Sequence, residues 1–232
     1  MPGIIQSQSN IDITPSTGFS TNFPVIENPI SQGGSWLNGL VDGVDWHNMK
    51  TTANGAVGSS DTFYLTSRVA DNIAHIKTSV KTFTPAQFAT AVAYKLAGYT
   101  GNGGSHECEL LLRFSISANV ARGYECSIGQ NPSGTYAFIV RWNGPIANYT
   151  TLKDPGSGIG SYVNVPTTLA NGDVLYAEIT AGNVITLKQN TRVLLTVIDN
   201  TWASGQAGMG TWPVDGAITG NQGWSSYQAG NL

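Results

Sequence analysis

Three apolar runs of strand length, at 108–116, 123–129 and 135–142, most constrain what this chain can fold into. Short polar breaks separate the runs. The second break contains Asn131, Pro132 and Gly134, which are residue types that favour turns. Because breaks this short can join only antiparallel neighbours, the sequence predicts a three-stranded meander.

Side chains alternate between the two faces of a strand, so each residue of the meander can be assigned to a face. The predicted core face receives Cys108, Leu110, Leu112, Phe114, Tyr124, Cys126, Ile128, Tyr136, Phe138, Val140 and Trp142. The other face receives Glu107, Glu109, Leu111, Arg113, Glu125, Ser127, Ala137, Ile139 and Arg141. The alternation therefore predicts one sheet face that carries Glu109, Arg113, Glu125 and Arg141 together.

This charged face has three interpretations. It can bind sugar hydroxyls or a uronate carboxylate, so its four charged residues are candidate ligand-binding residues. Two carboxylates can perform acid–base chemistry if their pKa values are pushed apart. The simplest interpretation is cross-strand ion pairs on a solvated sheet face, each stabilising the fold by a few tenths of a kcal/mol, roughly. We predict no catalytic residue here.

The remaining sequence also consists of short strand patterns between turns. A second meander is predicted at 174–180, 184–189 and 192–198, with further strands at 87–97 and 224–229. The glycine-rich segment 204–211 should allow close approach of neighbouring backbones. Regular strands without a long helix indicate a sandwich or barrel, and we predict an all-β fold built as an antiparallel two-sheet β-sandwich.

Composition excludes several classes of partner. Only 11% of the 232 residues are charged, against about 25% in ordinary soluble proteins, and the net charge is −3. With no cluster of Lys and Arg, we expect neither a nucleic-acid nor a membrane partner. The two cysteines, Cys108 and Cys126, fall on the predicted core face. They are interpreted as buried thiols, although a disulfide stays open.

The N-terminal segment, 1–20, is predicted to be an extended arm that precedes a single domain at 21–232. Its apolar residues, Ile4, Ile5, Ile11 and Ile13, cannot alone offset about 1–2 kcal/mol of backbone entropy for each ordered residue. We therefore expect the arm to dock on a neighbouring copy or on another subunit of an assembly. The alternative is an edge strand on its own sandwich. No secretory signal is visible in it.

Aromatic residues near predicted loops are the second candidate for ligand binding. They are Tyr149, Tyr162, Trp202, Trp212 and Trp224, and of these we select Tyr149, Trp202 and Trp212. Flat rings on the surface of a sandwich can stack on a pyranose, but tryptophans at strand ends also close the open ends of such folds. The histidines are isolated in the sequence, so no zinc site is expected.

The order of these pieces resembles the concanavalin A-like lectin/glucanase superfamily, in particular its laminin-G-like jelly rolls from bacteria and phages. The resemblance rests on Trp36 and on LLLR at 110–113, ARGYE at 121–125, YAFIVRWNG at 136–144, NGDVLYAEITAGNVITLKQN at 171–190, VIDNTWASGQAGMG at 197–210 and the final WSSYQAG. It covers about residues 20–230 and implies a jelly-roll fold. These motifs concern turns and packing, so they are specific for the fold and weak for activity.

The superfamily contains enzymes and binding proteins, and its active-site motifs are incomplete in this chain. Glucanases carry an ExDxxE-type strand, of which Glu107 and Glu109 come nearest while the third carboxylate is missing. The Arg/Glu, Gln-x-His and Tyr-rich strands of alginate lyases are not present in full. For the Ca²⁺/Mn²⁺ cluster of lectins, Asp42, Asp45 and His47 are too few. The resemblance leaves Ca²⁺ open, but no motif supports it, and no cofactor is expected.

We therefore predict a non-catalytic recognition or structural β-sandwich. It is expected to bind glycans or neighbouring subunits outside the cell or on a virion surface, for instance as a decoration component of a phage particle. The alternative is a carbohydrate-active enzyme, a glycoside hydrolase or polysaccharide lyase, with a divergent active site.

Overall fold

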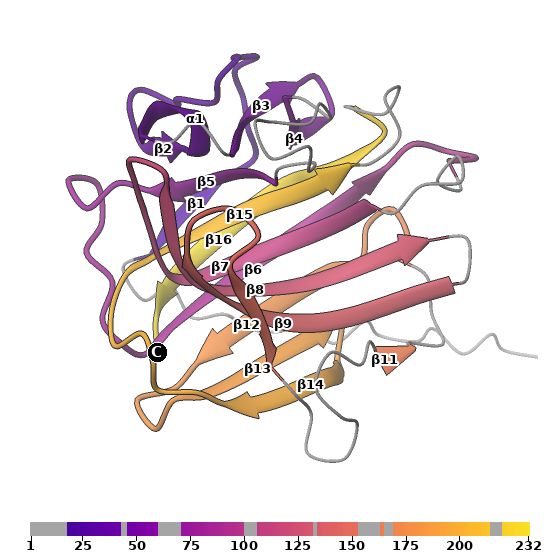
Figure 1. The fold of residues 1–232 in the computed structure, drawn as a ribbon. Helices are drawn as coiled ribbons and strands as arrows, with labels where there is room; N and C mark the ends of the chain where they lie inside the picture. Colours follow the sequence, from indigo (N-terminus) through magenta and orange to yellow (C-terminus); the bar gives the residue numbers. More distant parts are fainter. Residues whose placement is uncertain are drawn as a thin grey trace, which may run out of the picture.

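The computed structural model describes residues 18–42, 46–59, 71–99, 106–131, 134–152, 163–164, 169–213 and 220–232. Nearly all of its secondary structure is β, which confirms the predicted fold class (Figure 1). The one helix in these ranges is a single turn, α1 (Gly39–Asp42). No helix in the described part of the chain is long and apolar enough to cross a membrane.

Two sheets pack face to face. The first sheet has the strand order β10 (Tyr149–Leu152), β9 (Gly134–Gly144), β8 (Val120–Asn131), β7 (His106–Ser117), β15 (Gln206–Pro213) and β5 (Asn72–Ile76). The second has the order β4 (Gly55–Gly58), β16 (Gln222–Asn231), β6 (Gln87–Lys95), β12 (Val174–Ile179), β13 (Val184–Gln189) and β14 (Arg192–Ile198).

A short strand, β3 (His47–Thr52), joins the two sheets. It pairs antiparallel with β4 and parallel with β5, and the latter is the one parallel pair among the described strands. Three further strands lie off this path. They are β1 (Phe19–Thr21) beside β16, β2 (Trp36–Asn38) beside β5 and β11 (Val163–Asn164) beside β9.

Both predicted meanders are present. Strands β7, β8 and β9 form the first and extend one to three residues beyond each predicted end. In the second, β13 and β14 have the predicted bounds and β12 ends one residue earlier. Most of the glycine-rich segment 204–211 lies in β15, a central strand between β7 and β5.

The main core lies between the sheets. It includes Leu110 and Leu112, as predicted, together with Leu175 and Ile185, and all four are fully buried. Cys108 and Cys126 lie in the same cluster as free thiols, in agreement with the interpretation as small buried side chains.

Replacing Leu112 by alanine should lower the free energy of unfolding by about 2–5 kcal/mol, because the side chain is wholly enclosed between the sheets. Urea denaturation of both proteins measures this difference. Val193→Ala is the control, since Val193 is 52% exposed and should change stability by less than about 0.5 kcal/mol. A loss below about 1 kcal/mol for Leu112→Ala would show that the inner face is wrongly assigned.

The predicted faces of β9 are wrong. Ala137 and Ile139 point into the main core, where they pair with Ile128 and Cys126 of β8. Tyr136, Phe138, Val140 and Trp142 instead lie on the outer face of the first sheet, the face turned away from the second sheet. Both faces of β9 are buried, so large apolar side chains occur on the outer face as well and do not identify the inner face.

The predicted place of Arg113 is also wrong. A β-bulge interrupts the pairing of β7 with β8 after Leu112, and Arg113 has a positive φ of 46°. The bulge moves Arg113 off the outer face and sends Phe114 there, beside Leu111. Gly123 on β8, with φ 138°, fits against it because a Cβ would lie 2.6 Å from the Phe114 backbone.

The N-terminal arm lies almost wholly outside the described residues, and so do Ile4, Ile5, Ile11 and Ile13. Its last part is described. Strand β1 pairs with β16, and the Phe19 ring packs edge-on against Trp36 at 5.4 Å. The docking of the arm on a partner remains a prediction.

Candidate functional site

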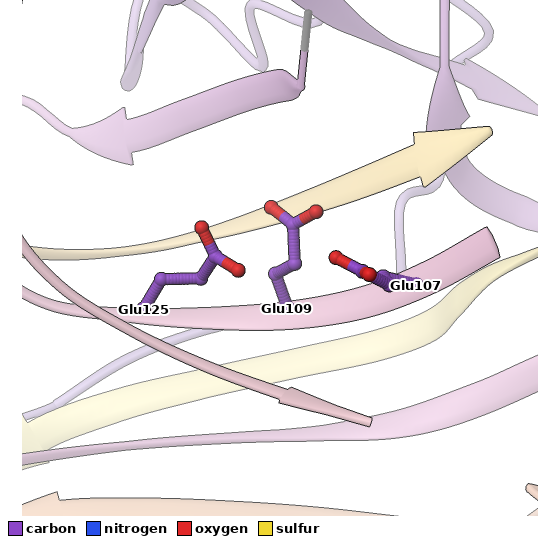
Figure 2. A group of neighbouring side chains, drawn as sticks. All are labelled: Glu107, Glu109 and Glu125. Atoms are coloured by element: carbon purple, nitrogen blue, oxygen red, sulfur yellow. The ribbon is translucent and has the colours of Figure 1, made fainter. Parts of the chain in front are cut away.

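Three glutamates project from neighbouring strands onto the outer face of the first sheet. Glu107 and Glu109 alternate along β7, and Glu125 comes from β8, where it pairs with Leu111. Figure 2 shows the three carboxylates in a row, with that of Glu109 in the middle. One oxygen from each lies within 4.8 Å of the other two. We call these three residues the glutamate cluster.

The glutamate cluster is buried. Glu107, Glu109 and Glu125 are 7%, 0% and 2% exposed. Apolar side chains cover part of the same face, because Trp46 packs with Leu111 and with Trp142, whose ring lies 5.8 Å away. The predicted solvated face with cross-strand ion pairs is therefore wrong.

Hydrogen bonding differs sharply among the three carboxylates. Tyr136 donates its hydroxyl proton to Glu107 Oε1 at 2.6 Å. Ser127 Oγ and Trp142 Nε1 donate to the two oxygens of Glu125, each at 2.6 Å. In the part of the chain that the structure describes, neither oxygen of Glu109 has a hydrogen-bond partner. Such donors stabilise a carboxylate in its charged form, so Glu125 is the member best suited to ionise.

Burial dominates the electrostatics of the glutamate cluster. Desolvation, followed by the charge of Glu125, raises the pKa of Glu107 to about 8. Desolvation and the charges of Glu125, Asp71 and Glu107 raise the pKa of Glu109 well above its ordinary value. The pKa of Glu125 is raised by burial and lowered in part by its two donors. At neutral pH the cluster must therefore hold protons or a cation.

Asp71 adds a fourth buried carboxylate. It immediately precedes β5 and is 9% exposed. Its pKa is raised well above the ordinary value by burial and by the charges of Glu125 and Glu107. Two ion pairs occur among the described residues, Arg141–Asp199 and Lys188–Glu178, and neither involves these carboxylates.

The two arginines predicted beside Glu109 and Glu125 lie elsewhere. Arg113 is 1% exposed at one end of the sandwich, where its guanidinium donates to backbone carbonyls of several loops. Arg141 faces the opposite way from the glutamate cluster, because the faces of β9 are reversed, and it pairs with Asp199. Only the two carboxylates of the predicted charged face are therefore brought together.

The aromatic candidates are dispersed. Tyr149 on the edge strand β10 is 48% exposed, with its ring 5.3 Å from that of Trp142. Trp202 is half-buried beneath Arg122, which lies 5.5 Å from the ring centroid. Trp212 on β15 is half-buried and pairs with Glu107 of β7. Trp224 is fully buried in the core, and Tyr162 lies outside the described residues.

Sequence reasoning missed the surroundings of the carboxylates. Tyr136 and Trp142 were assigned to the core face, so their hydrogen bonds to Glu107 and Glu125 were not expected. The sequence around Asp71 did not indicate that it lies near these glutamates, since the pairing of β5 with β15 is what places it in the first sheet.

Solved structures with the same arrangement of strands identify the architecture. The exoplasmic/lumenal domain of VIP36, in its Ca²⁺- and Man3GlcNAc-bound form, matches with a TM-score of 0.55 at 9% identity, over 90% of this chain and 91% of that one. The carbohydrate-binding module CBM66 from Bacillus subtilis matches with a TM-score of 0.50 at 12% identity, over 87% and 96%. The chain has a concanavalin A-like fold.

A third match is a glycoside hydrolase family 16 endo-glucanase from Bacteroides ovatus, with a TM-score of 0.50 and 12% identity over 92% of this chain and 99% of that one. No protein-family model and no curated protein sequence matches the chain. The concanavalin A-like jelly roll predicted from the sequence motifs is thus confirmed as a fold. At these identities the likeness extends no further than the fold.

Proposed function

We propose that this chain binds glycans without processing them, through the exposed edge of the first sheet at β10. The observation that carries the proposal is the Tyr149 ring, which is 48% exposed and lies beside the Trp142 ring on this edge. An exposed flat ring can stack against the apolar face of a pyranose. The fold is shared with a carbohydrate-binding module, which agrees with the proposal but does not carry it.

Polar groups around Thr150 lie on the opposite face of β9 and β10 from the Tyr149 ring, because side chains alternate along a strand. Thr150 Oγ1 accepts hydrogen bonds from Asn143 Nδ2 at 3.1 Å and from Arg141 at 3.4 Å. Arg141 is fixed in turn by Asn143, Thr201 and the ion pair with Asp199. These half-buried groups hold one another in place and so fix the edge strand that presents the Tyr149 ring, which lowers the cost in conformational entropy of binding a sugar.

Binding to a panel of polysaccharides in affinity gels, followed by calorimetry with the best oligosaccharide, tests the proposal. Tyr149→Ala should weaken the affinity at least about tenfold, which corresponds to about 1.4 kcal/mol. Tyr176→Ala is the matched control because Tyr176 is a half-buried aromatic residue on the second sheet, stacked on Phe88 at 5.8 Å. Equal losses in both variants, or binding unaffected by Tyr149→Ala, would contradict the proposed site.

A carbohydrate-active enzyme is the second candidate, because the glutamate cluster brings carboxylates with unequal donors within 4.8 Å. Retaining glycosidases use carboxyl groups about 5–5.5 Å apart. Burial opposes this reading, since side chains that are 0–7% exposed offer a sugar ring almost no contact surface.

We expect no product from β-glucans, xylan or alginate, in assays for reducing ends and for the unsaturated products of elimination. The reason is the burial of the carboxylates together with the incomplete motifs. Product that appears with the wild type and disappears with Glu109→Gln or Glu125→Gln would reverse this conclusion and make the chain an enzyme. A role as a decoration component of a larger assembly is a separate proposal, which depends on the N-terminal arm.

A further inference from the structure

The Glu109 carboxylate is the least satisfied polar group of the outer face. It is 0% exposed, neither oxygen has a hydrogen-bond partner among the described residues, and it lies between the carboxylates of Glu107 and Glu125 (Figure 2). The strand beside it leaves room for it, since a Cβ at Gly210 would collide with Glu109 Oε2. A buried carboxylate without donors is unfavourable in either protonation state, because even the neutral acid has a proton to donate.

The spacing of the glutamate cluster matches a single bound ion. Because one oxygen from each residue lies within 4.8 Å of the others, a point exists no further than about 2.8 Å from all three, which is 4.8 Å divided by √3. Ca²⁺–oxygen distances are about 2.3–2.6 Å, so small rotations of the glutamate side chains bring all three oxygens into range. Mg²⁺ needs about 2.0–2.1 Å in strict octahedral geometry, which fits this spacing less well.

The neighbouring donors suit a metal site. Tyr136, Ser127 and Trp142 each hold one oxygen of Glu107 or Glu125 at 2.6 Å. Each of these bonds uses one lone pair and fixes the orientation of the carboxylate, which is how second-shell groups support metal ligands. All the ligand atoms are oxygens, and such a donor set selects hard cations such as Ca²⁺ over zinc or copper.

Charge balance supports the same conclusion. Asp71, which is 9% exposed and immediately precedes β5, adds a fourth buried carboxylate. The ion pairs of the described residues place no cation of the protein at this cluster. Repulsion between several buried carboxylates is relieved most directly by a divalent cation.

We propose that Glu107, Glu109 and Glu125 form a binding site for one Ca²⁺ ion on the outer face of the first sheet. The site does not depend on the proposed glycan binding at Tyr149, and either can fail alone. Because the carboxylates are buried, the ion stabilises the covered face of the sheet rather than bridging to a sugar.

Calorimetry with CaCl₂ on the full chain, after removal of metals with EDTA and dialysis, tests the site. We expect one ion per chain, a raised melting temperature, and an affinity at least about tenfold weaker in Glu109→Gln. Glu178→Gln is the matched control, since Glu178 lies on the second sheet in the ion pair with Lys188. No heat and no thermal shift at millimolar CaCl₂, or unchanged binding in Glu109→Gln, would overturn the proposal.

A second measurement uses only the wild type, so it does not depend on the folding of a variant. Tb³⁺ takes the place of Ca²⁺ at oxygen sites and emits when a nearby tryptophan is excited. Trp142 donates to Glu125, which places an indole next to the proposed ion. We expect sensitised Tb³⁺ emission that CaCl₂ displaces with a stoichiometry of one. Emission that CaCl₂ does not displace, or no emission, would contradict a Ca²⁺ site at the glutamate cluster.

Discussion

Replacing Arg113 by methionine is expected to lower the free energy of unfolding by about 3–5 kcal/mol. Arg113 is 1% exposed, and its guanidinium hydrogen-bonds to several loops at once. Its Nε donates to Pro85 O at 2.8 Å, Nη1 to Asn183 Oδ1 and Trp202 O at 2.8 Å, and Nη2 to Thr180 O at 3.2 Å. Methionine fills part of the volume but leaves these partly buried acceptors without their donors.

The planar fork of the guanidinium matters as well as its charge. Arg113→Lys retains the charge but cannot reach acceptors on several sides, so it should recover only part of the loss. Arg122→Met is the matched control, because Arg122 is exposed over the Trp202 ring and should change stability by at most about 1 kcal/mol. Urea denaturation monitored by tryptophan fluorescence measures all three variants. A loss below about 1 kcal/mol for Arg113→Met would show that water satisfies these carbonyls equally well.

Strand positions were predictable because turn residues and strand length are local properties. The bounds of β13 and β14 follow from Asn183 and Asn190, which occupy the turns with φ of 63° and 54°. The meander β12–β13–β14 follows from the same regular spacing. Turn chemistry thus specified where strands begin and end, but not which neighbours they take across the sheet.

The faces were less predictable, because alternation identifies a buried face only when the other face is solvated. On β9 both faces are buried, and the strand carries aromatic residues on one side and Ala137 and Ile139 on the other. The register of β8 against β9 determines which face is inner, since Ile139 pairs with Cys126 and both lie in the main core. The bulge at Arg113 then broke the alternation within β7. Nothing in the residues around it marks a left-handed arginine.

The shared face of the glutamate cluster was predictable from the sequence, but its burial was not. Glu109 and Glu125 were assigned to one face, and the structure places them there. What the sequence could not show is that this face is covered and that aromatic donors from β9 reach the carboxylates. A charged face read from alternation alone is expected to be solvated. Burial turns the same residues into a site with strongly raised pKa values.

Stability that decreases with rising pH is the second large effect expected of the metal-free protein. Glu107 has a folded-state pKa of about 8, against about 4.3 in an unfolded chain. The folded state therefore binds more protons than the unfolded state between these values. The contribution of Glu107 to stability is complete below its pKa in the unfolded chain and is lost as pH rises through its pKa in the folded protein. The pKa values of Glu109, Glu125 and Asp71 shift in the same direction.

The clearest window lies between pH 6.5 and 8. Burial and the charge of Lys95 lower the pKa of His106 to about 4, so this histidine makes stability rise with pH below about 6.5 and has no effect above it. Each additional proton held by the folded state lowers the free energy of unfolding by about 1.4 kcal/mol per pH unit. Urea denaturation in EDTA at several pH values should therefore show a loss of at least about 2 kcal/mol across this window, the amount expected from one such carboxyl alone.

Glu107→Gln should make this pH dependence less steep, because the amide does not titrate, and Glu178→Gln on the second sheet is the control for the substitution. Adding CaCl₂ provides an independent comparison, since a bound cation favours the charged carboxylates and should reduce or reverse the slope. A free energy of unfolding that is constant or increases from pH 6.5 to 8 in EDTA would mean that the carboxylates ionise in the folded protein at ordinary pKa values. In that case water must reach the outer face of β7 and β8, and the buried environment described for Glu107 and Glu109 would be wrong.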